Sequence, residues 1–371
     1  MMDGNLKRIT LVCNTSNSVL TFRRKLIETL QNEGYEVSVI AFDNQREAEI
    51  KAMGVEFHCV EDANRSLNPF RILTLTGRYK KLIKEVSPDI VLTFMLKPNI
   101  FGVKAAKKLG IKNIYSFVDG VGDVFINNSL KWKIIRFVVC KLYKSSFKYS
   151  KKVFFPNKDD KLEFIQRKLI TQTQGVIVEG TGIDLEKFSF KPLKNRKSFL
   201  MIARMLKTKG VFEYCEAARI VKAKYPEAEF HYVGPEGTVK IADIQSYIEE
   251  GIVCYLGATT DVRPYIEDCT VHVLPSYREG QGQVSLEAGA MGRALIVCDT
   301  NGSRDTVQDG YNGFLVEVKS AQQIAEKMIW FIENPEKTEE MGKNARKFAE
   351  EKFDSVKINE KILSIIESEL E

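Results

Sequence analysis

Residues 8–43 read RITLVCNTSNSVLTFRRKLIETLQNEGYEVSVIAFD, and their pattern indicates the fold class. A short β-rich run, RITLVC, is followed by the polar, turn-like NTSNSV, by LTFRRKLIETLQNEG with apolar residues at helical spacing, and by a second strand, YEVSVIAFD. Strands that alternate with helices of about 10–15 residues are typical of βαβ units, whose strands form a parallel sheet. The start of the chain therefore predicts an α/β fold.

The same alternation continues and then starts again. A helix is expected near residues 69–86, followed by the strand IVLTFML, and a second series begins at KSFLMIARM after a turn-rich stretch at 180–195. A chain of 371 residues is about twice the commonest domain size. We therefore predict two Rossmann-like domains, with a hinge near residue 185.

Composition indicates a globular protein with a substantial core. Apolar residues make up 44% and charged residues 28%, and 55 Lys and Arg against 49 Asp and Glu give a net charge of +6. The scattered cysteines form no C-x-x-C pair and read as the reduced thiols of a cytosolic protein. They are Cys13, Cys59, Cys140, Cys215, Cys254, Cys269 and Cys298. We read no signal peptide and no apolar run of the ~20 residues that a spanning helix needs.

One segment breaks the even mixing of charge. Residues 131–152, KWKIIRFVVCKLYKSSFKYSKK, carry eight Lys and Arg interleaved with aromatic and aliphatic residues. A basic amphipathic helix of this kind is typical of an anionic membrane surface. A helix that packs on the core and leaves its basic face in water explains the pattern equally well. Nucleic-acid binding is disfavoured, because the basic surplus is confined mainly to this helix and the hinge region.

Several chemistries are excluded by missing motifs. The turn after the first strand has no glycine, so the G-x-G-x-x-G fingerprint of dinucleotide binding is absent. There is no G-x-x-x-x-G-K-[ST] loop, no H-E-x-x-H and no D-x-D pair, and the three histidines, His58, His231 and His272, form no cluster. We expect no metal site and no cofactor, so cationic side chains and helix ends must handle any nucleotide diphosphate.

Such cations follow the first strand of the second half. That strand ends at Ala203-Arg204, a polar loop leads to Lys209, and a helix begins at Gly210. Ligands of open α/β sheets bind at the carboxyl ends of strands, where a helix N-terminus already favours anions. Arg204 and Lys209 could therefore neutralise a diphosphate leaving group, although two solvated loop cations would give the same pattern.

Two glutamates stand in the stretch PSYREGQGQVSLEAGAMG. Glu279 lies in a loop after a strand, and Glu287 lies about two turns into the next helix. A separation of up to ~12 Å matches a sugar–diphosphate–ribose unit and exceeds the ~6.5–9.5 Å of an inverting hydrolase. One carboxylate could bind sugar hydroxyls and the other ribose hydroxyls, while Gly280 and Gly282 leave room for backbone N–H groups.

Together the motifs ARMLKTKG, YLGATTDVRPYI, VLPSYREGQGQVSLEAGAMGRALI and DTNGSRDTVQDGYNGFLV resemble the retaining glycosyltransferases of family 4. The resemblance is nearest to bacterial enzymes that add sugars to polyprenyl-diphosphate-linked glycans for capsules, O-antigens or other glycoconjugates. It implies the GT-B fold, with two Rossmann-like parallel-sheet domains facing a cleft. It also implies an acceptor domain at 1–182, a donor domain at 183–350, and a C-terminal helix at 351–371 that crosses back to the N-terminal domain.

The resemblance also assigns roles to individual residues. Arg204 and Lys209 match the pair that holds the donor diphosphate, Glu279 lies near the donor sugar, and Asp119 is a further catalytic candidate. Donor binding is implied for Glu287, Gly280, Gln281, Gly282, Gln283, Val284, Gly210, Leu256 and Gly257. The acceptor side is implied for Asn14, Thr15, Ser16, Asn17, Gly120 and Gly122.

This sequence departs from the family pattern in three places, one of which is VDGVG, where the family usually has TGLG. The family commonly has Leu-Pro-Arg after the glutamate–glycine pair, where this chain has Gln281-Gly282-Gln283, a change that implies a different donor-sugar preference. Many members place a histidine of the N-terminal half against the donor, and this chain offers only His58 there. Asp119, an extra carboxylate in VDGVG, is our candidate replacement.

The predicted activity is transfer of a hexose or N-acetylhexosamine from a nucleotide sugar, UDP-linked in our reading, to a glycan or lipid-linked acceptor. The protein is expected in the cytoplasm or peripherally on the inner face of the cytoplasmic membrane. A sugar-nucleotide epimerase or phosphorylase of the same architecture, and a catalytically silent UDP-sugar-binding subunit, remain the alternatives.

Overall fold

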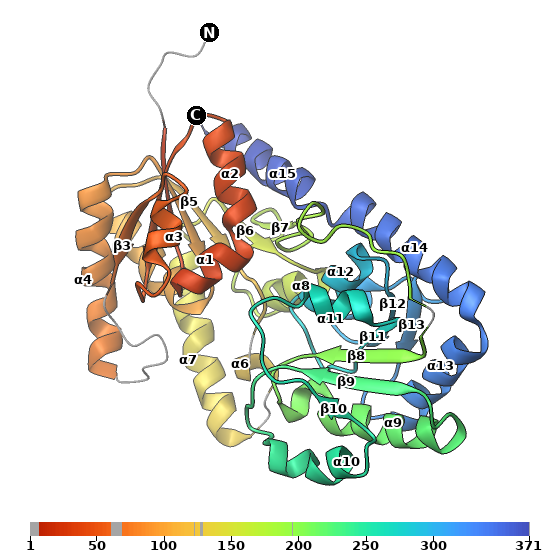
Figure 1. The fold of residues 1–371 in the computed structure, drawn as a ribbon. Helices are drawn as coiled ribbons and strands as arrows, with labels where there is room; N and C mark the ends of the chain where they lie inside the picture. Colours follow the sequence, from red (N-terminus) through yellow and green to blue (C-terminus); the bar gives the residue numbers. More distant parts are fainter. Residues whose placement is uncertain (1–6, 61–68, 122, 127–128, 195, 371) are drawn as a thin grey trace. The chain divides into compact units, whose positions relative to one another are not determined.

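The structure is a computed structural model that describes residues 7–60, 69–121, 123–126, 129–194 and 196–370. The chain forms two compact units (Figure 1). The N-terminal unit comprises Met1–Gly182 together with Ser355–Glu371, and the C-terminal unit is Ile183–Asp354. The last helix therefore belongs to the unit in which the chain begins.

In the part of the N-terminal unit that the structure describes, seven parallel strands form one sheet in the order β3-β2-β1-β4-β5-β6-β7. β1 lies inside the sheet, with Ile9 opposite Val37 on one side and Ile90 on the other. Near-continuous apolar strands of this kind are buried on both faces, as parallel sheets require. The strands are β1 (Arg8–Val12), β2 (Glu36–Ala41), β3 (Glu56–Cys59), β4 (Ile90–Phe94), β5 (Asn113–Phe117), β6 (Lys152–Phe155) and β7 (Gly175–Ile177).

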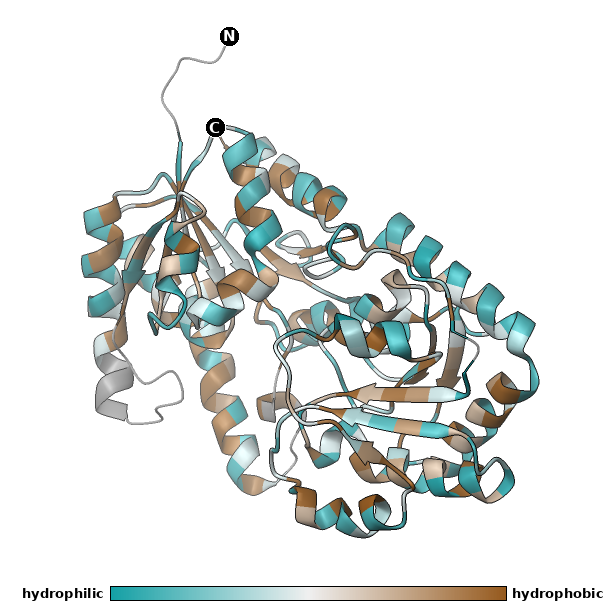
Figure 2. Ribbon diagram, in the orientation of Figure 1, coloured by the Kyte–Doolittle hydropathy of each residue, from teal (hydrophilic) through white to brown (hydrophobic). Residues whose placement is uncertain are grey.

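Helices connect these strands and cover the sheet, and Figure 2 shows hydrophilic and hydrophobic residues alternating along them. They are α1 (Ser16–Phe22), α2 (Arg24–Asn32), α3 (Glu47–Lys51), α4 (Pro69–Val86), the π-helix η1 (Pro98–Gly102), α5 (Val103–Lys108), α6 (Asp123–Ile126), α7 (Leu130–Phe147), α8 (Lys158–Gln166) and α15 (Ser355–Ser368). None of the helices in the described ranges is both long enough and apolar enough to cross a bilayer.

The polar run NTSNSV is not the turn that the sequence predicts. Helix α1 begins at Ser16, because Thr15 and Ser18 form a reciprocal capping box in which each side chain accepts a bond from the other's backbone N–H. Arg23, with φ of −123°, then separates α1 from α2. Two short helices thus replace the single helix expected after this run.

The C-terminal helix α15 packs on the N-terminal unit through one apolar face. Ile358, Ile362 and Ile366 recur at four-residue spacing, are buried, and join the cluster that contains Leu26 and Leu30 of α2. The hydroxyl of Tyr115 on β5 donates to the carbonyl of Ile366 at 3.2 Å. The expected crossing of the last helix back to the N-terminal unit is therefore confirmed.

In the C-terminal unit, the described residues form six parallel strands in the order β10-β9-β8-β11-β12-β13. The strands are β8 (Ser198–Ile202), β9 (Glu229–Val233), β10 (Cys254–Tyr255), β11 (Val271–Leu274), β12 (Ala294–Cys298) and β13 (Gly313–Val316). The helices are η2 (Lys207–Lys209), α9 (Val211–Lys224), η3 (Ile241–Ile244), α10 (Gln245–Glu249), α11 (Arg263–Asp268), α12 (Gln283–Ala290), η4 (Arg304–Thr306), α13 (Ala321–Glu333) and α14 (Pro335–Lys352).

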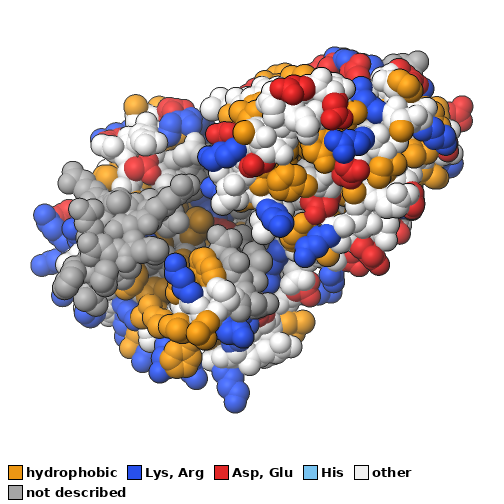
Figure 3. All heavy atoms as spheres, turned by 90° about the horizontal axis from the view of Figure 1, so that it is seen from below, with side chains coloured by type: hydrophobic (Ala, Val, Ile, Leu, Met, Phe, Trp, Pro, Cys, Tyr) orange, Lys and Arg blue, Asp and Glu red, His pale blue; other side chains and the backbone are white. Residues whose placement is uncertain are grey.

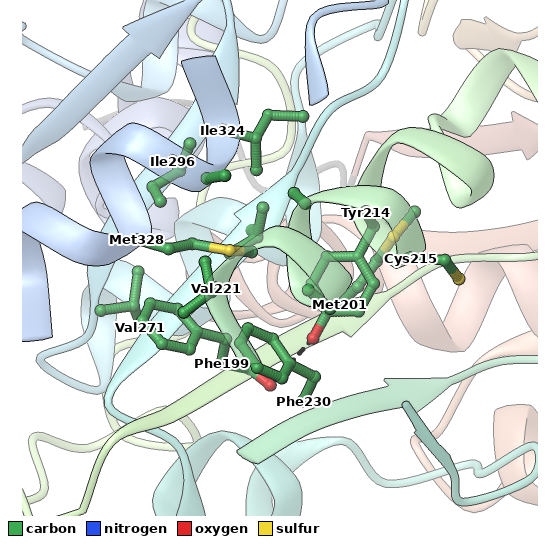
Figure 4. Packing of buried hydrophobic residues seen from close by; sticks show 14 of the residues in the cluster. Phe199, Met201, Tyr214, Cys215, Val221, Phe230, Val271, Ile296, Ile324 and Met328 are labelled. Atoms are coloured by element: carbon green, nitrogen blue, oxygen red, sulfur yellow. Dashed lines mark hydrogen bonds between the residues drawn. The ribbon is translucent and has the colours of Figure 1, made fainter. Parts of the chain in front are cut away.

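The core of this unit fixes β8, which leads into the first candidate loop. Phe199 stacks on Phe230 of β9 with ring centroids 5.3 Å apart, and Tyr214 of α9 packs edge-on against Phe230 (Figure 4). The Tyr214 hydroxyl donates to the carbonyls of Phe199 and His231 at 2.9 and 3.0 Å. The buried hydroxyl therefore has partners, and β8, β9 and α9 are held together directly beneath the loop that follows β8.

Candidate functional site

The loop after β8 carries the first candidate residues of the C-terminal unit. Arg204 is exposed just beyond the strand, and Lys209 ends the 3-10 turn η2. Gly210 follows with φ of 77° at the start of α9. A Cβ atom there would lie 2.3 Å from the carbonyl oxygen of Pro275, so glycine is required for the two loops to approach.

The loop after β11 is bonded to the loop after β8. Lys209 Nζ lies 2.5 Å from Glu279 Oε1, and both side chains are largely buried. The backbone N–H of Tyr277 donates to the carbonyl of Thr208 at 2.9 Å, and its hydroxyl donates to Glu213 of α9 at 2.5 Å. Two residues seventy positions apart in the sequence are thereby brought into contact at the carboxyl edge of the sheet.

The loop after β12 supports Glu279 from the other side. The N–H of Glu279 donates to the carbonyl of Asn301 at 3.0 Å. Gly302 has φ of 75°, and a Cβ there would lie 2.3 Å from the Glu279 carbonyl oxygen. The backbone of Glu279 therefore contacts the loop after β12, while its side chain pairs with Lys209.

The segment after Glu279 turns into helix α12. Gly280 lies in the bend, Gln281 is buried, and Gly282 adopts φ of 67° as the N-cap. Gln283 is the first residue of the helix, and Val284 packs against the buried apolar cluster under it. The glycine-rich run is therefore a loop anchored at both ends by buried residues.

Glu287 lies on the second turn of α12 and is partly buried. Desolvation raises the pKa of its carboxyl from 4.5 to about 7, Lys187 opposes this rise, and Asp261 adds to it. Asp261 is itself paired with Arg263 at 2.7 Å. Because burial dominates, the Glu287 carboxyl is close to half-ionised at neutral pH, and a ligand that donates hydrogen bonds to it would favour the ionised form.

Leu256 and Gly257 follow β10 and are linked to the Arg204 loop through β9. The N–H of Gly234 donates to the Gly257 carbonyl at 2.9 Å. Gly234 has φ of 147°, and a Cβ there would lie 1.9 Å from the carbonyl oxygen of Ala203. Leu256 is 39% exposed, so a large apolar side chain stands open to solvent at this edge.

In the N-terminal unit, Asn14 and Thr15 connect β1 to α1, and Ser16 and Asn17 are the first two residues of that helix. Thr15 caps α1, and the Ser16 N–H and hydroxyl both donate to Asp43. Asn17 Oδ1 accepts from Arg46 at 3.0 Å. These three side chains are engaged within the protein, whereas Asn14 Oδ1 is buried and has no hydrogen-bond partner among the described residues.

Asp119 follows β5 and pairs with Arg23, the residue between α1 and α2. Arg23 is 7% exposed, and its guanidinium lies 4.2 Å from the ring centroid of Phe94 at the end of β4. Burial raises the pKa of Cys13 to about 12, with opposing effects from Arg23 and Asp119. Gly120 has φ of 143°, and Gly122 lies outside the described residues.

No group of three His, Cys, Asp or Glu side chains suited to a metal ion occurs within the described ranges. The candidate residues of the C-terminal unit are the Lys209–Glu279 ion pair, Arg204, Glu287 and the loops around them. Those of the N-terminal unit are centred on the Arg23–Asp119 ion pair.

Family models match both halves of the chain. Residues 8–157 match the glycosyl transferase 4-like model, and residues 182–348 match the glycosyl transferases group 1 model. An N,N'-diacetylbacillosaminyl-diphospho-undecaprenol alpha-1,3-N-acetylgalactosaminyltransferase of Campylobacter jejuni is 30% identical over 91% of this chain and 93% of its own length. The chain belongs to the family 4 glycosyltransferases. The resemblance found in its motifs is thus confirmed, as is its identification as an enzyme of this class.

A second relative and two solved structures complete the comparison. A UDP-Gal:alpha-D-GlcNAc-diphosphoundecaprenol alpha-1,3-galactosyltransferase of Escherichia coli is 24% identical over 90% of this chain and 89% of its own length. HepE of Anabaena in complex with UDP-glucose superposes with a TM-score of 0.79 at 18% identity, covering 97% of this chain and 99% of that one. A glycosyltransferase of Rickettsia africae gives 0.77 at 20% identity, with 98% of each chain covered. The predicted GT-B fold is confirmed.

In this glycosyltransferase, the arrangement in the C-terminal unit suits an anionic, hydroxyl-rich ligand. Cations at a strand end can stabilise negative charge that develops on a leaving group, and carboxylates can accept hydrogen bonds from hydroxyls. Sequence reasoning missed the residues that place these groups. These residues are Arg23, Gly234 and Gly302. In the sequence, Arg23 is only a charged residue between two apolar helical runs, and Gly234 and Gly302 are only glycines in loops that follow strands.

Proposed function

We propose that the protein transfers a hexose or N-acetylhexosamine from a UDP-sugar to a polyprenyl-diphosphate-linked glycan, with retention of configuration, in the synthesis of a bacterial surface polysaccharide or glycoconjugate. The observation that carries the proposal is the Lys209–Glu279 pair, which joins the loops at the carboxyl ends of β8 and β11, with Arg204 exposed just beyond β8. The names of the Campylobacter and Escherichia relatives support a diphosphoundecaprenol-linked acceptor. The complex of HepE with UDP-glucose supports the donor class.

In the proposed reaction, Arg204 and Lys209 bind the donor diphosphate. As the bond between the anomeric carbon and the diphosphate breaks, negative charge grows on the departing oxygen, and fixed cations lower the energy of that state. Glu279 orients Lys209 and accepts from sugar hydroxyls. Glu287 accepts from the ribose. The charge compensation is assigned to these side chains and needs no metal ion.

On the acceptor side, we propose roles for Asn14 and Asp119. Asn14 Oδ1 is a buried acceptor without a partner among the described residues, and a substrate hydroxyl would satisfy it. Asp119 pairs with Arg23, which holds its side chain in one orientation. The protein would work at the inner face of the cytoplasmic membrane, where a polyprenyl-linked acceptor is embedded.

The test is release of UDP and elongation of a polyprenyl-diphosphate-linked saccharide with a panel of UDP-sugars. Replacing Arg204 or Lys209 with Ala should lower kcat by about a hundredfold or more, the scale of removing a stabilising donor from a charged transition state. Lys207→Ala is the matched control, because this lysine lies in the same short turn η2 and should leave kcat within about twofold.

Each outcome has a definite meaning. Unchanged turnover of both Arg204→Ala and Lys209→Ala would contradict the assignment of the diphosphate site. UDP-sugar binding without UDP release for any acceptor would indicate a binding subunit, and conversion of the UDP-sugar without an acceptor would indicate an epimerase.

A further inference from the structure

Met95 has a backbone conformation that its own side chain disfavours. It follows β4 directly with φ of 71°, in the left-handed region, and its side chain is 41% exposed. Such a conformation costs free energy that glycine avoids, and strain of this kind clusters at functional sites. The other described non-glycine residues with positive φ are polar, namely Ser87, Lys168 and Lys319. Among the described residues of this class, only Met95 presents an apolar side chain to solvent.

A buried polar network holds the backbone of Met95. Its N–H donates to the carbonyl of Phe117 on β5 at 3.2 Å, and its carbonyl accepts from the Asn99 N–H at 3.0 Å. The Asn99 side chain accepts from the Thr93 hydroxyl at 2.7 Å and donates to the same Phe117 carbonyl at 2.8 Å. Thr93 also bonds to Ser116 at 3.0 Å, and all of these side-chain partners are fully buried. Buried hydrogen bonds are costly to lose, so the network compensates for the strain.

The helix that follows Met95 is also irregular. Asn99 belongs to the π-helix η1, a rare geometry that is frequent at functional sites. A Cβ at Gly102, the last residue of η1, would lie 3.4 Å from the Val12 side chain at the end of β1. The segment from Met95 to Gly102 is therefore anchored to the strands on both sides of β4.

Met95 lies at the point where the strand order of the N-terminal sheet reverses. β4 pairs with β1 on one side and with β5 on the other, and β2 and β3 continue the sheet beyond β1. Ligands of open α/β sheets bind at the carboxyl ends of strands at such a switch point. The loop that carries Met95 thus comes between the loop of Asn14 and the loop of Asp119.

These adjacent loops combine one exposed apolar group with two hydrogen-bond acceptors. Asn14 Oδ1 is buried and has no partner among the described residues, and the Asp119 side chain is 29% exposed beside Arg23. A sugar ring has the matching pattern, with C–H groups on its face and hydroxyl donors around its edge. A methionine thioether is flexible and polarisable, so it packs well on such a face. Figure 3, a view from below relative to Figure 1, faces the edge at which these strands end and shows hydrophobic side chains at the surface among charged ones.

We propose that Met95 is a specificity-determining residue that packs on the C–H face of the acceptor's terminal sugar, while hydroxyls of the same ring donate to Asn14 and Asp119. The inference rests on the proposed function, because it takes the acceptor to bind this unit. A hydroxyl turned against the thioether would lose its hydrogen bonds to water. Met95 therefore selects the sugar, and the orientation of that sugar, that present C–H groups to it.

The first experiment detects the contact without any transfer. The full-length protein is labelled with carbon-13 at its methionine methyl groups and titrated, without a UDP-sugar, with octyl glycosides of glucose, galactose, N-acetylglucosamine and N-acetylgalactosamine. The signal that disappears in Met95→Leu belongs to Met95, and at least one probe should shift it. The signal of Met53, which precedes β3 at the amino edge of the sheet, should not move. A Met95 signal that responds to none of these probes, or to UDP-glucose alone, overturns the proposal.

The second experiment removes the side chain and keeps the backbone. Met95→Gly should raise the KM for the lipid-linked acceptor about tenfold and narrow the preference among acceptor sugars, with kcat and the KM for the UDP-sugar within about twofold. The same variant should melt about 1–3 °C higher, because glycine has no left-handed penalty. Met95→Leu keeps an apolar surface and should hold the acceptor KM within about threefold of the wild type.

Ser87→Gly is the matched control. Ser87 has φ of 49° and is exposed shortly before β4, at the opposite edge of the sheet. Its replacement should raise the melting temperature by a similar amount and leave the acceptor KM unchanged. A Met95→Gly variant that gains stability without any change in acceptor KM or in sugar preference would show that the strained residue does not contact the substrate, and would overturn the proposal.

Failure of this inference is distinguishable from failure of the proposed function. The labelled protein is titrated without a UDP-sugar, so a shifted Met95 signal in a protein that releases no UDP overturns only the reaction. Sugar transfer by a protein whose Met95 signal does not move, and whose Met95→Gly variant keeps the acceptor KM, overturns only the role of Met95.

Discussion

At the scale of single residues, burial of Glu287 makes ionisation of its carboxyl unfavourable, and a ligand that donates hydrogen bonds to the carboxylate would offset this free-energy cost. Desolvation raises its pKa to about 7, so the folded protein retains a proton that the unfolded chain releases near pH 4.5. The folded state therefore binds more protons between these values, and the stability contributed by this group falls as the pH rises from about 4.5 to about 7.

The first prediction follows from this loss of stability with rising pH. Glu287→Gln should stabilise the C-terminal unit more at pH 8 than at pH 5, by at most about 3 kcal/mol because the side chain is only partly buried. Urea unfolding at the two pH values measures the difference. The same variant should bind UDP more weakly at pH 8. An equal effect on stability at both pH values would contradict the assigned pKa.

The stability contributed by His272 depends on pH in the opposite direction. It lies on β11 in register with Leu200 and Leu295, and desolvation lowers its pKa to about 3. Its neutral form is the one that the folded state tolerates, so stability is full above pH 6.5 and is lost as the pH falls toward about 3. Burial explains this histidine as a packed strand residue, as its alternation in TVHVLP indicates.

The second prediction concerns this histidine. His272→Leu should raise stability at pH 5 relative to the wild type and flatten the pH dependence below 6.5, since it removes the only ionisable group at that position. The difference in urea midpoint between pH 5 and pH 8 is the measurement. A variant that loses stability on acidification as steeply as the wild type would show that other groups control the loss of stability at low pH.

At the scale of elements, the candidate site depends on how closely loops approach one another. Gly210 lies at the junction of η2 and α9, where a Cβ would lie 2.3 Å from the carbonyl of Pro275. Gly251 also has a positive φ, 67°, but a Cβ there would meet nothing within 4 Å. The two glycines separate the cost of a left-handed backbone from the cost of a steric collision.

The third prediction uses this pair. Gly251→Ala should cost about 1 kcal/mol of stability, the strain of a left-handed residue. Gly210→Ala should cost about 3 kcal/mol or more and should also lower kcat, because the loop that carries Lys209 must move away from the one that carries Glu279. Urea unfolding and steady-state kinetics test both variants. Equal losses of stability in the two variants would indicate that the loop after β11 moves to accommodate the added methyl group at little free-energy cost.

At the scale of the whole molecule, the chain ends in the unit in which it began. Helix α15 buries Ile366 completely against the N-terminal unit, whereas Val356 of the same helix is 46% exposed. The last helix should therefore support the stability of the N-terminal unit and have little effect on the donor site.

The fourth prediction tests this division. Ile366→Ala should lower the stability of the N-terminal unit by about 2–5 kcal/mol, the cost of truncating a buried isoleucine. Val356→Ala should change it by less than about 0.5 kcal/mol. Hydrogen exchange resolved by segment would show faster exchange in β1 and α2, while the Kd for UDP stays unchanged. Faster exchange in the C-terminal unit instead would contradict this view.

The sequence by itself determined the fold class and the family, and it located several of the strands and helices. Apolar periodicity and strand–helix alternation are local properties, so IVLTFML and GQVSLEAGAMG predicted a strand and a helix that the structure contains. The capping box at Thr15 was equally local, but its small polar residues also suit a turn, and the resulting helix was not foreseen. The candidate site residues were nominated from motifs, and their roles stay predictions.

Contacts between distant segments could not be determined in this way. The pairing of Lys209 with Glu279, the burial of Arg23 beside Asp119 and the raised pKa of Glu287 each depend on side chains from separate strand-end loops. No local pattern encodes the distance between such loops, because that distance is set by how the whole sheet twists and packs. The sequence thus specifies which groups are available, and the folded chain specifies which of them meet.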